Sequence, residues 1–313
     1  MDNINEKVFN ELFLQKLSED QEKVAANGAA YVRQKLREVS FARKIIQPVY
    51  ITKADCQRSL NHDQLVKIVD IEPDSKAMAV NFRGAGDTSY VQGDRYEIAF
   101  YKIESDTFEK EEIELLAYEM PITSIIENNT VKDIQKIEDE GFISKVNAAI
   151  AVEEAVKATS KSVSVTTSGY DYPTAAVFTA LFNALEGGND DTTTGYNPLK
   201  TDVVLMNYID FNKLIQMPAS VVGDNLASEV TVEGYKYSQL FGKKVVVTNK
   251  SEYVAPGTLY AFAAQEFLGH FFILNDTKFW IEKKKDIISW VAWEHIGMGI
   301  GNTKGCAKVT WTS

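Results

Sequence analysis

One uninterrupted stretch, from residue 129 to about residue 160, constrains the fold most, because it contains neither proline nor a run of turn-forming residues. Thr130, followed three residues later by Asp133, predicts a helix start, since a hydroxyl and a carboxylate at this spacing cap free backbone amides. Apolar residues then recur mainly at spacings of three to five, which predicts one long helix with an imperfect apolar stripe. At 1.5 Å per residue, about thirty residues make a rod of about 45 Å. Such a rod is long for the core of a globular enzyme.

Charge is divided unevenly along the chain. The 313 residues carry a formal net charge of −11, with a pI near 4.9. Because phosphate recognition needs a concentrated basic face, this balance argues against a dedicated nucleic-acid binder. Carboxylates crowd between Glu97 and Glu140, whereas the first sixty residues are rich in lysine and arginine. The division suits subunits whose basic arm lies on a neighbour's acidic face, and solvated surface charge is the alternative.

Residues that commonly carry chemistry do not form a recognisable site in the sequence. Cys56 and Cys306, and the histidines His62, His270 and His295, lack metal-ligand spacing, so we expect no metal, no cofactor and no disulfide framework. The sequence has no nucleophile elbow and no Walker loop, so no catalytic residues are predicted. No apolar segment is long enough to span a membrane, and the N-terminus has no signal-peptide core. A cytosolic protein is expected.

Three groups of residues have both a chemical and a structural interpretation. Gly297–Gly301 resembles a phosphate loop, but no helix follows it, which favours flexible backbone between strands. Asp190 and Asp191 lack the ligand ladder of a calcium site and indicate a solvated loop. The carboxylates of Glu138–Glu140 suggest acid/base chemistry. Consecutive carboxylates on a helix point in different directions, however, which favours a salt-bridging or solvated face.

The remaining patterns predict a mixed chain. Amphipathic helices are predicted at 1–26 and 29–40, and the first has Phe9, Leu12 and Phe13 on its apolar face. A long hairpin follows, with a glycine-rich tip and one face that a partner is expected to bury. The predicted strands before the long helix are 65–72, 77–82, 95–103 and 112–118. After it come a glycine and proline bend at 162–173, a short helix at 174–185, a polar loop at 186–198, an α+β unit at 201–267 with a helix capped by Asp210, and long antiparallel strands to the C-terminus.

Taken in order, these elements resemble the major capsid protein of tailed double-stranded DNA phages, which has the Hong Kong 97 type fold. The passage ITSIIENNTVKDIQKIEDEGFI resembles the entry to that family's spine helix, and DVVLMNYIDFNKLIQM resembles its step into the A domain. LFGKKVVVTN and APGTLYAFA are similar to later A-domain strands, and WVAWEHIGMGIGNTKGCAKVTW is similar to the closing strand pair. The resemblance covers nearly the whole chain and implies an α+β fold.

The resemblance also implies a function. The chain is expected to be a structural subunit, not an enzyme, that self-assembles into pentamers and hexamers of an icosahedral virion capsid in the host bacterial cytoplasm. Implied partners are copies of itself, a portal, separate scaffold or decoration proteins, and packaged DNA that is enclosed without sequence-specific binding. The implied domains are an N-arm at 1–34, the P-domain start at 35–75, an E-loop hairpin at 76–105, the P domain at 106–185 with its spine helix at 129–160, the A domain at 186–267, and P-domain return strands at 268–313. The residues expected at subunit interfaces are Phe9, Leu12, Phe13, Arg83, Asp87, Asp94, Arg95, Glu138, Asp139, Asp190 and Asp191.

The chain departs from some members of the family in two respects. The tip from Gly84 to Arg95 contains no lysine, so an isopeptide cross-link between subunits is not expected. The sequence begins directly with the arm, so scaffold is expected from a separate protein, or the sequence is that of the mature form. The nearest alternative is an encapsulin, a protein compartment with the same fold whose members typically lack an extended N-arm. The other alternative is an α+β enzyme whose site escapes motif searching.

Overall fold

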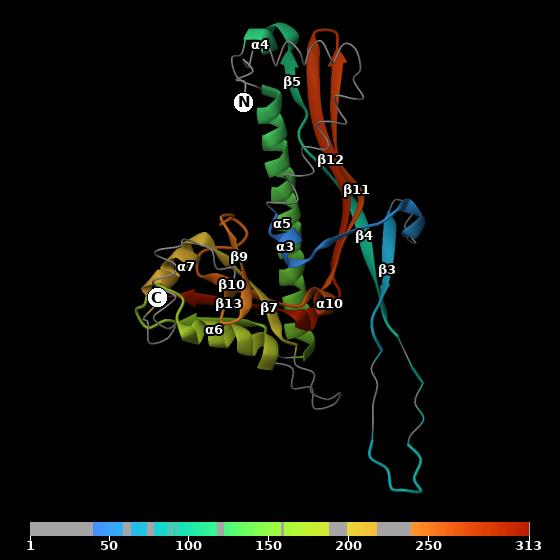
Figure 1. Ribbon diagram of the computed structural model, residues 1–313, viewed down its shortest axis with the longest axis vertical. Coiled ribbons are helices and arrows are strands. Elements are labelled where there is room, and N and C mark those ends of the chain that lie inside the picture. Colours follow the sequence, from blue (N-terminus) through green and yellow to red (C-terminus); the bar gives the residue numbers. More distant parts are fainter. Residues whose placement is uncertain are drawn as a thin grey trace.

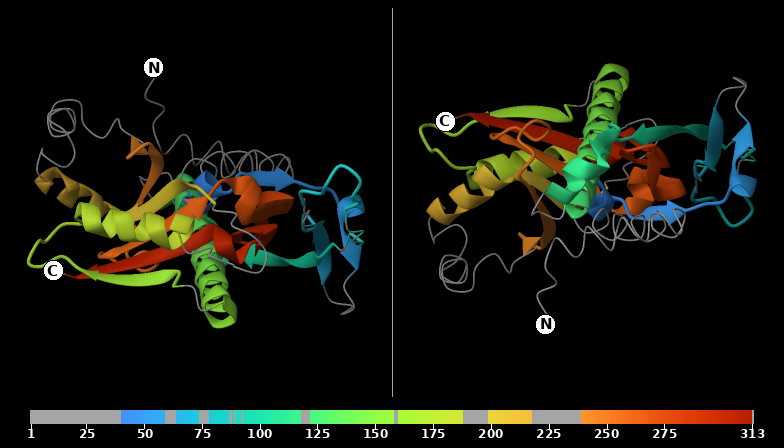
Figure 2. Two further views of the ribbon diagram at one scale, coloured as in Figure 1. Left: turned by 90° about the horizontal axis from the view of Figure 1, so that it is seen from below. Right: turned by 90° about the horizontal axis from the view of Figure 1, so that it is seen from above.

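One long helix, α5 (Ile122–Lys157), is the axis of the computed structural model, and two β-sheets pack against it (Figure 1). Its 36 residues correspond to about 54 Å at 1.5 Å per residue. In projection along this axis, the second sheet lies on one side of α5 and the β3–β4 hairpin on the other (Figure 2). The structure describes residues 40–58, 64–73, 78–86, 88, 90–91, 93–117, 122–157, 160–187, 199–217 and 239–312.

The start of α5 differs from the sequence prediction. The predicted capping residues, Asn128–Thr130, lie inside the helix, and Thr130 is buried there. A polar residue with cap propensity does not end a helix when tertiary packing favours continuation, because propensity differences are only about 0.7 kcal/mol or less for ordinary residues. The end of the helix, at Lys157, lies close to the predicted end at Ser160.

The first sheet runs along α5 and is built around a long antiparallel pair. Its strand order is β1-β11-β12-β4-β3-β2, and β5 also pairs with β12. Alternate residues of β12, from Ile288 to Met298, are buried and face the helix. This alternation is what a sheet with one covered face requires. The strands are β1 (Pro48–Tyr50), β2 (Gln57–Arg58), β3 (Leu65–Asp70), β4 (Arg95–Glu104), β5 (Phe108–Glu111), β11 (Gly269–Lys284) and β12 (Ile287–Ile300).

The second sheet is covered on both faces. Its order is β6-β13-β10-β7-β9-β8. In β7, Val203 and Leu205 belong to the core shared with α5, whereas Val204 and Met206 pack in a separate core with α6 (Ala175–Phe182). The strands are β6 (Ser162–Thr166), β7 (Thr201–Asn207), β8 (Gln239–Leu240), β9 (Lys243–Thr248), β10 (Thr258–Ala263) and β13 (Cys306–Thr312). From the sequence, the C-terminal strand β13 was expected among the return strands. In the structure it pairs instead with β6 and β10 of this second sheet.

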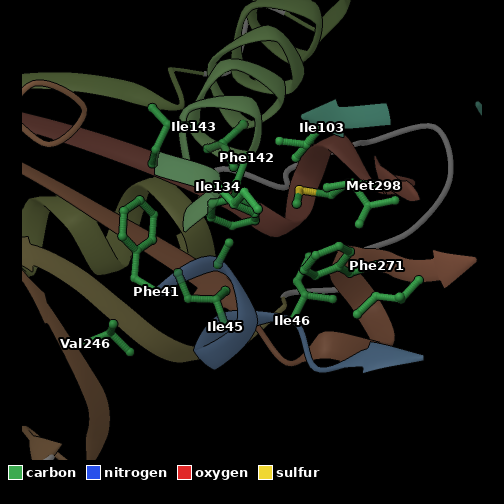
Figure 3. Packing of buried hydrophobic residues seen from close by; sticks show 14 of the residues in the cluster. Phe41, Ile45, Ile46, Ile103, Ile134, Phe142, Ile143, Val246, Phe271 and Met298 are labelled. Carbon is green, nitrogen blue, oxygen red and sulfur yellow. The ribbon is translucent and has the colours of Figure 1, made fainter. Parts of the chain in front are cut away.

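The core joins elements that are far apart in the sequence (Figure 3). Phe41 and Ile45, at the short helix α3 (Ala42–Ile45), pack with Phe142 of α5, and the ring centroids of Phe41 and Phe142 are 6.3 Å apart. Val246 of β9 and Met298 of β12 belong to the same cluster. The segment that follows the first 39 residues is therefore held at the junction of both sheets with α5.

Several local predictions were wrong. Residues 112–117 form a helix, α4 (Glu112–Ala117), where a strand was predicted, and residues 78–82 of the predicted hairpin strand are not in a strand. Ser162–Thr166, predicted as part of a bend, is strand β6. Helix α7 (Tyr208–Lys213) is capped by the side chain of Asn207, which accepts from Ile209 N, and not by Asp210. The Asp210 carboxylate instead accepts from Gly257 N at 2.7 Å.

The other short helical segments connect these elements. They are α10 (Gln265–Leu268), the 3-10 turns Lys53–Asp55, Leu214–Gln216 and Thr303–Gly305, and a π-helical turn at Asn183–Gly187. None of the helices within the described ranges is long and apolar enough to cross a membrane. The predicted helices at 1–26 and 29–39 lie outside the described residues.

Candidate intersubunit surfaces

The most unusual surface is a hairpin at the edge of the first sheet that extends beyond the body of the subunit (Figure 1). We call the described residues of 64–99, which include β3 and the first half of β4, the hairpin arm. Large apolar side chains are exposed along it, and Phe82 is fully exposed. The exposed apolar residues of the arm are Leu65, Ile71, Met78, Val80, Phe82, Tyr90 and Val91. Large exposed apolar side chains that gather on one hairpin typically mark an interaction surface.

The predicted charged residues of the arm are on its surface. Arg83, Asp94 and Arg95 are all exposed. Arg95 Nε lies 2.7 Å from Asp70 Oδ1, but both side chains are at least 70% exposed, so the pair contributes little to folding. These charges therefore remain available to a partner. Asp87 lies outside the described residues, as do Phe9, Leu12, Phe13, Asp190 and Asp191.

Glu138 and Asp139 are not on the surface, and the expectation that they face a neighbouring subunit was wrong. Both are fully buried. Glu138 binds Arg43 of α3, whose Nε lies 3.0 Å from Glu138 Oε2. A second carboxylate, Glu294 of β12, lies 3.3 Å from Arg43 Nη2 and accepts from Thr277 Oγ1 at 3.0 Å. We call Arg43, Glu138 and Glu294 the ionic cluster. It joins α3, α5 and β12.

Asp139 holds the same segment from the adjacent position of the helix. Its Oδ1 accepts from Ser40 Oγ at 2.8 Å and from the Ala42 amide at 3.0 Å. Its Oδ2 lies 2.6 Å from Lys250 Nζ. Because consecutive helical residues project about 100° apart, Glu138 and Asp139 bind the segment around α3 from two directions. The chain is thus fixed to α5 directly after residue 39.

The electrostatics of the ionic cluster are asymmetric. The Arg43 side chain is 2% exposed and donates three hydrogen bonds to Glu138 but only one, at 3.3 Å, to Glu294. Burial, and then the neighbouring charge of Glu138, raises the pKa of Glu294 well above its ordinary value of 4.5, against the opposing effect of Arg43. Burial and the same two carboxylates raise the pKa of Tyr101 to about 12. Arg43 therefore pairs mainly with Glu138, and burial favours the protonated form of Glu294.

The sequence contains a signal for this buried position that the prediction did not use. Glu138 lies four residues after Ile134 and four before Phe142, both of which are fully buried. Residues at this spacing share one face of a helix, so Glu138 lies on the apolar stripe itself. Only the third carboxylate, Glu140, is exposed, and it accepts from Tyr253 Oη at 3.2 Å. The partners Arg43 and Glu294 are too distant in sequence for a local pattern to find.

The other candidate groups have structural positions. Gly297 and Gly299 lie within β12, not in a loop between strands, which corrects the prediction of flexible backbone. Cys306 is buried, and burial raises the pKa of its thiol to about 12. His270 and His295 are partly buried. Among the described residues, no group of His, Cys, Asp or Glu side chains is arranged to bind a metal ion.

Comparisons with known proteins match the fold and not the sequence. No protein-family model and no curated protein matches the chain. A solved structure from Microbacterium phage Oxtober96 has 12% identity and a TM-score of 0.59, covering 87% of this chain and 91% of that one. The capsid of cyanophage P-SCSP1u has 13% identity and a TM-score of 0.55, covering 79% and 84%. The mature capsid of bacteriophage PhiM1 has 9% identity and a TM-score of 0.56, covering 88% and 87%.

These likenesses extend over most of the chain and establish its fold. The chain has the α+β fold of these phage structures, the Hong Kong 97 type fold, with two sheets packed on one long helix. The fold class expected from the sequence is confirmed. At these identities the likeness concerns architecture alone.

Proposed function

We propose that this chain is the structural, non-enzymatic subunit of an icosahedral phage capsid, assembling into pentamers and hexamers that enclose double-stranded DNA. The observation that carries the proposal is the hairpin arm. Seven of its large apolar side chains are exposed in the single subunit, and they become buried only if a second molecule covers them. The capsid structures with the same fold make another copy of this chain the natural partner.

The parts of the subunit are assigned by analogy with the fold. We assign the hairpin arm to the E-loop, the first sheet with α5 to the P domain with its spine, and the second sheet with α6 and α7 to the A domain. Residues 1–34 are assigned to the N-arm. Because Ser40 and α3 are fixed to α5 by buried charges, this arm would leave the subunit from a defined point.

The charge balance supports a container for nucleic acid. At −11, the chain repels a polyanion, so packaged DNA would move past the wall without adhering to it. Portal, scaffold and decoration proteins are proposed as further partners of the virion. We also propose that the shell forms without isopeptide cross-links, since the segment from Gly84 to Arg95 contains no lysine. Denaturing gels of assembled particles should then show monomers, and covalent oligomers would contradict this part.

Substitutions on the arm test the proposal. Phe82→Ser and Tyr90→Ser remove fully and almost fully exposed apolar side chains, so the urea midpoint of the unassembled subunit should stay unchanged while the yield of sedimenting particles falls. Thr88→Ala, an exposed polar position on the same arm, is the matched control and should assemble normally. Full particle yield with both serine substitutions would show that the arm is not an assembly surface.

A further inference from the structure

Three glycines spaced two apart face three β4 side chains that are also spaced two apart. Gly297 and Gly299 lie on the same face of β12, because every second residue of a strand does, and Gly301 follows the strand directly. A methyl group added to any of the glycines would lie well inside the 3.5–4.0 Å at which carbon atoms pack. It would lie 2.8 Å from Phe100 Cε1 at Gly297, 2.8 Å from Ile98 Cγ1 at Gly299, and 2.6 Å from Tyr96 Cζ at Gly301. We call Gly297, Gly299 and Gly301 the glycine socket.

The socket lies where β4 changes partner. Residues 100–104 of β4 pair with β12, ending with Phe100 opposite Gly297. Residues 95–99 pair instead with β3 of the hairpin arm. From Gly299 onward, β12 has β11 as its ladder partner, and the β4 side chains lie over the glycines where a ladder neighbour would otherwise be. The absence of Cβ atoms lets β4 approach this closely and cross toward the arm.

A small separate core fixes the crossing. Ile98, Phe100 and Phe272 form a buried cluster distinct from the two main cores. Tyr96 Oη lies 2.9 Å from His270 Nδ1, and the His270 ring stacks on Phe272 with centroids 5.4 Å apart. The arm is therefore joined to the rest of the first sheet by a packed joint.

We propose that the glycine socket sets the direction in which the hairpin arm leaves the subunit and thereby positions the arm on a second copy of this chain. The inference rests on the proposed function for its second half, because the partner is the neighbouring subunit. The first half concerns the single subunit alone. Each socket glycine is a positioning residue that acts through the β4 side chain above it.

The direction of the arm can be measured in the unassembled subunit. Spin labels on cysteines substituted for the exposed residues Thr88, on the arm, and Glu252, beside the second sheet, report the distance from arm to body once Cys56 is replaced by serine. Gly299→Ala should shift or broaden this distance distribution. Gly93→Ala is the matched control, because a methyl group there meets no atom within 4 Å, and it should leave the distribution unchanged.

Assembly is measured on the same proteins without labels. Gly299→Ala should need an about tenfold higher subunit concentration to form particles, the factor that corresponds to an overpacking penalty of the usual size. The second substitution Ile98→Ala removes the two atoms that lie nearest to the new methyl group but also weakens the small core, so the double variant should recover part of the distance and of the assembly. The urea midpoint of the variants checks that the body remains folded.

Two results would overturn the inference. In the first, Gly299→Ala keeps the wild-type distance distribution. In the second, it shifts the distance but assembles like the wild type. Failure of the wild-type chain itself to form particles would instead refute the proposed function, and the distance measurement would still decide whether the socket directs the arm.

Discussion

Replacing Glu138 and Glu294 separately by glutamine should have very different effects on stability. Arg43 is 2% exposed, and its closest contacts are with Glu138. Removing one partner of a buried ion pair costs about 3–5 kcal/mol. We expect Glu138→Gln to lie near about 3 kcal/mol, the lower end of that range, because Glu294 can then lose its proton and partly replace the missing charge. Glu294→Gln replaces a carboxyl whose raised pKa favours the protonated form by an amide of similar shape, so we expect a loss of less than about 1 kcal/mol.

The double variant tests whether one carboxylate compensates for the loss of the other. With both carboxylates gone, Arg43 has no counterion in the cluster, and the expected loss is about 5 kcal/mol, more than the sum of the single losses. The assay is urea unfolding of unassembled subunits at one concentration, since assembly would add stability by mass action. Glu140→Gln, on the exposed side of the same turn, is the control and should change stability by no more than about 0.5 kcal/mol. Equal losses of stability in the two single variants, with additive losses in the double variant, would refute the unequal roles of Glu138 and Glu294.

The pH dependence follows from the raised pKa of Glu294. The folded protein holds this proton more tightly than the unfolded chain, so the stability it contributes is complete below the ordinary pKa of 4.5 and is lost as pH rises toward the folded value. Wild-type stability should therefore fall relative to Glu294→Gln as the pH rises above the ordinary pKa of 4.5, by at most about 1.4 kcal/mol per pH unit. Parallel stability curves for the two proteins would contradict this assignment.

Two further predictions concern other buried groups. Lys250→Met leaves the fully buried Asp139 without its cation and should lower the free energy of unfolding by about 3 kcal/mol, measured by urea titration; an unchanged midpoint would show that the Ser40 and Ala42 donors suffice. Cys306, whose pKa burial raises to about 12, should react with a thiol reagent only in denaturant, whereas the partly exposed Cys56 should react in the native protein. Equal rates for both thiols in the native protein would contradict the burial of Cys306.

The sequence was most informative about the long helix and the buried strands. A stretch without proline and with an apolar stripe predicts a helix by itself, and DVVLMN, KKVVVTN and TLYAFA are strands as expected. The boundary of α5 was not predictable from capping residues, because packing against two sheets continues the helix through Thr130. The strand predicted at 112–118 was a local error. Its glutamates, leucines and alanine are good helix formers, and they form α4.

The candidate surfaces could be predicted only in part, because they depend on contacts between segments that are far apart in the sequence. The exposed arm could be anticipated from its weak alternation and glycine-rich tip. Glu138 was assigned to the surface because its partners are distant in the sequence. Arg43 is 95 residues away, and Glu294 lies on β12. Gly297 and Gly299 were interpreted as flexible backbone because the β4 side chains that occupy the space above them are about two hundred residues earlier in the chain. Pairing of β13 with β6 and β10 is likewise invisible to a local pattern.

Electron microscopy of the purified, expressed chain tests the central claim most directly. We expect closed icosahedral shells, or free pentamers and hexamers, in which the hairpin arm of one subunit lies on the next. A species that remains strictly monomeric at concentrations where shell proteins assemble would contradict it. Shells that contain a loaded protein cargo, with neither portal nor DNA, would keep the assembly but replace the virion by a protein compartment.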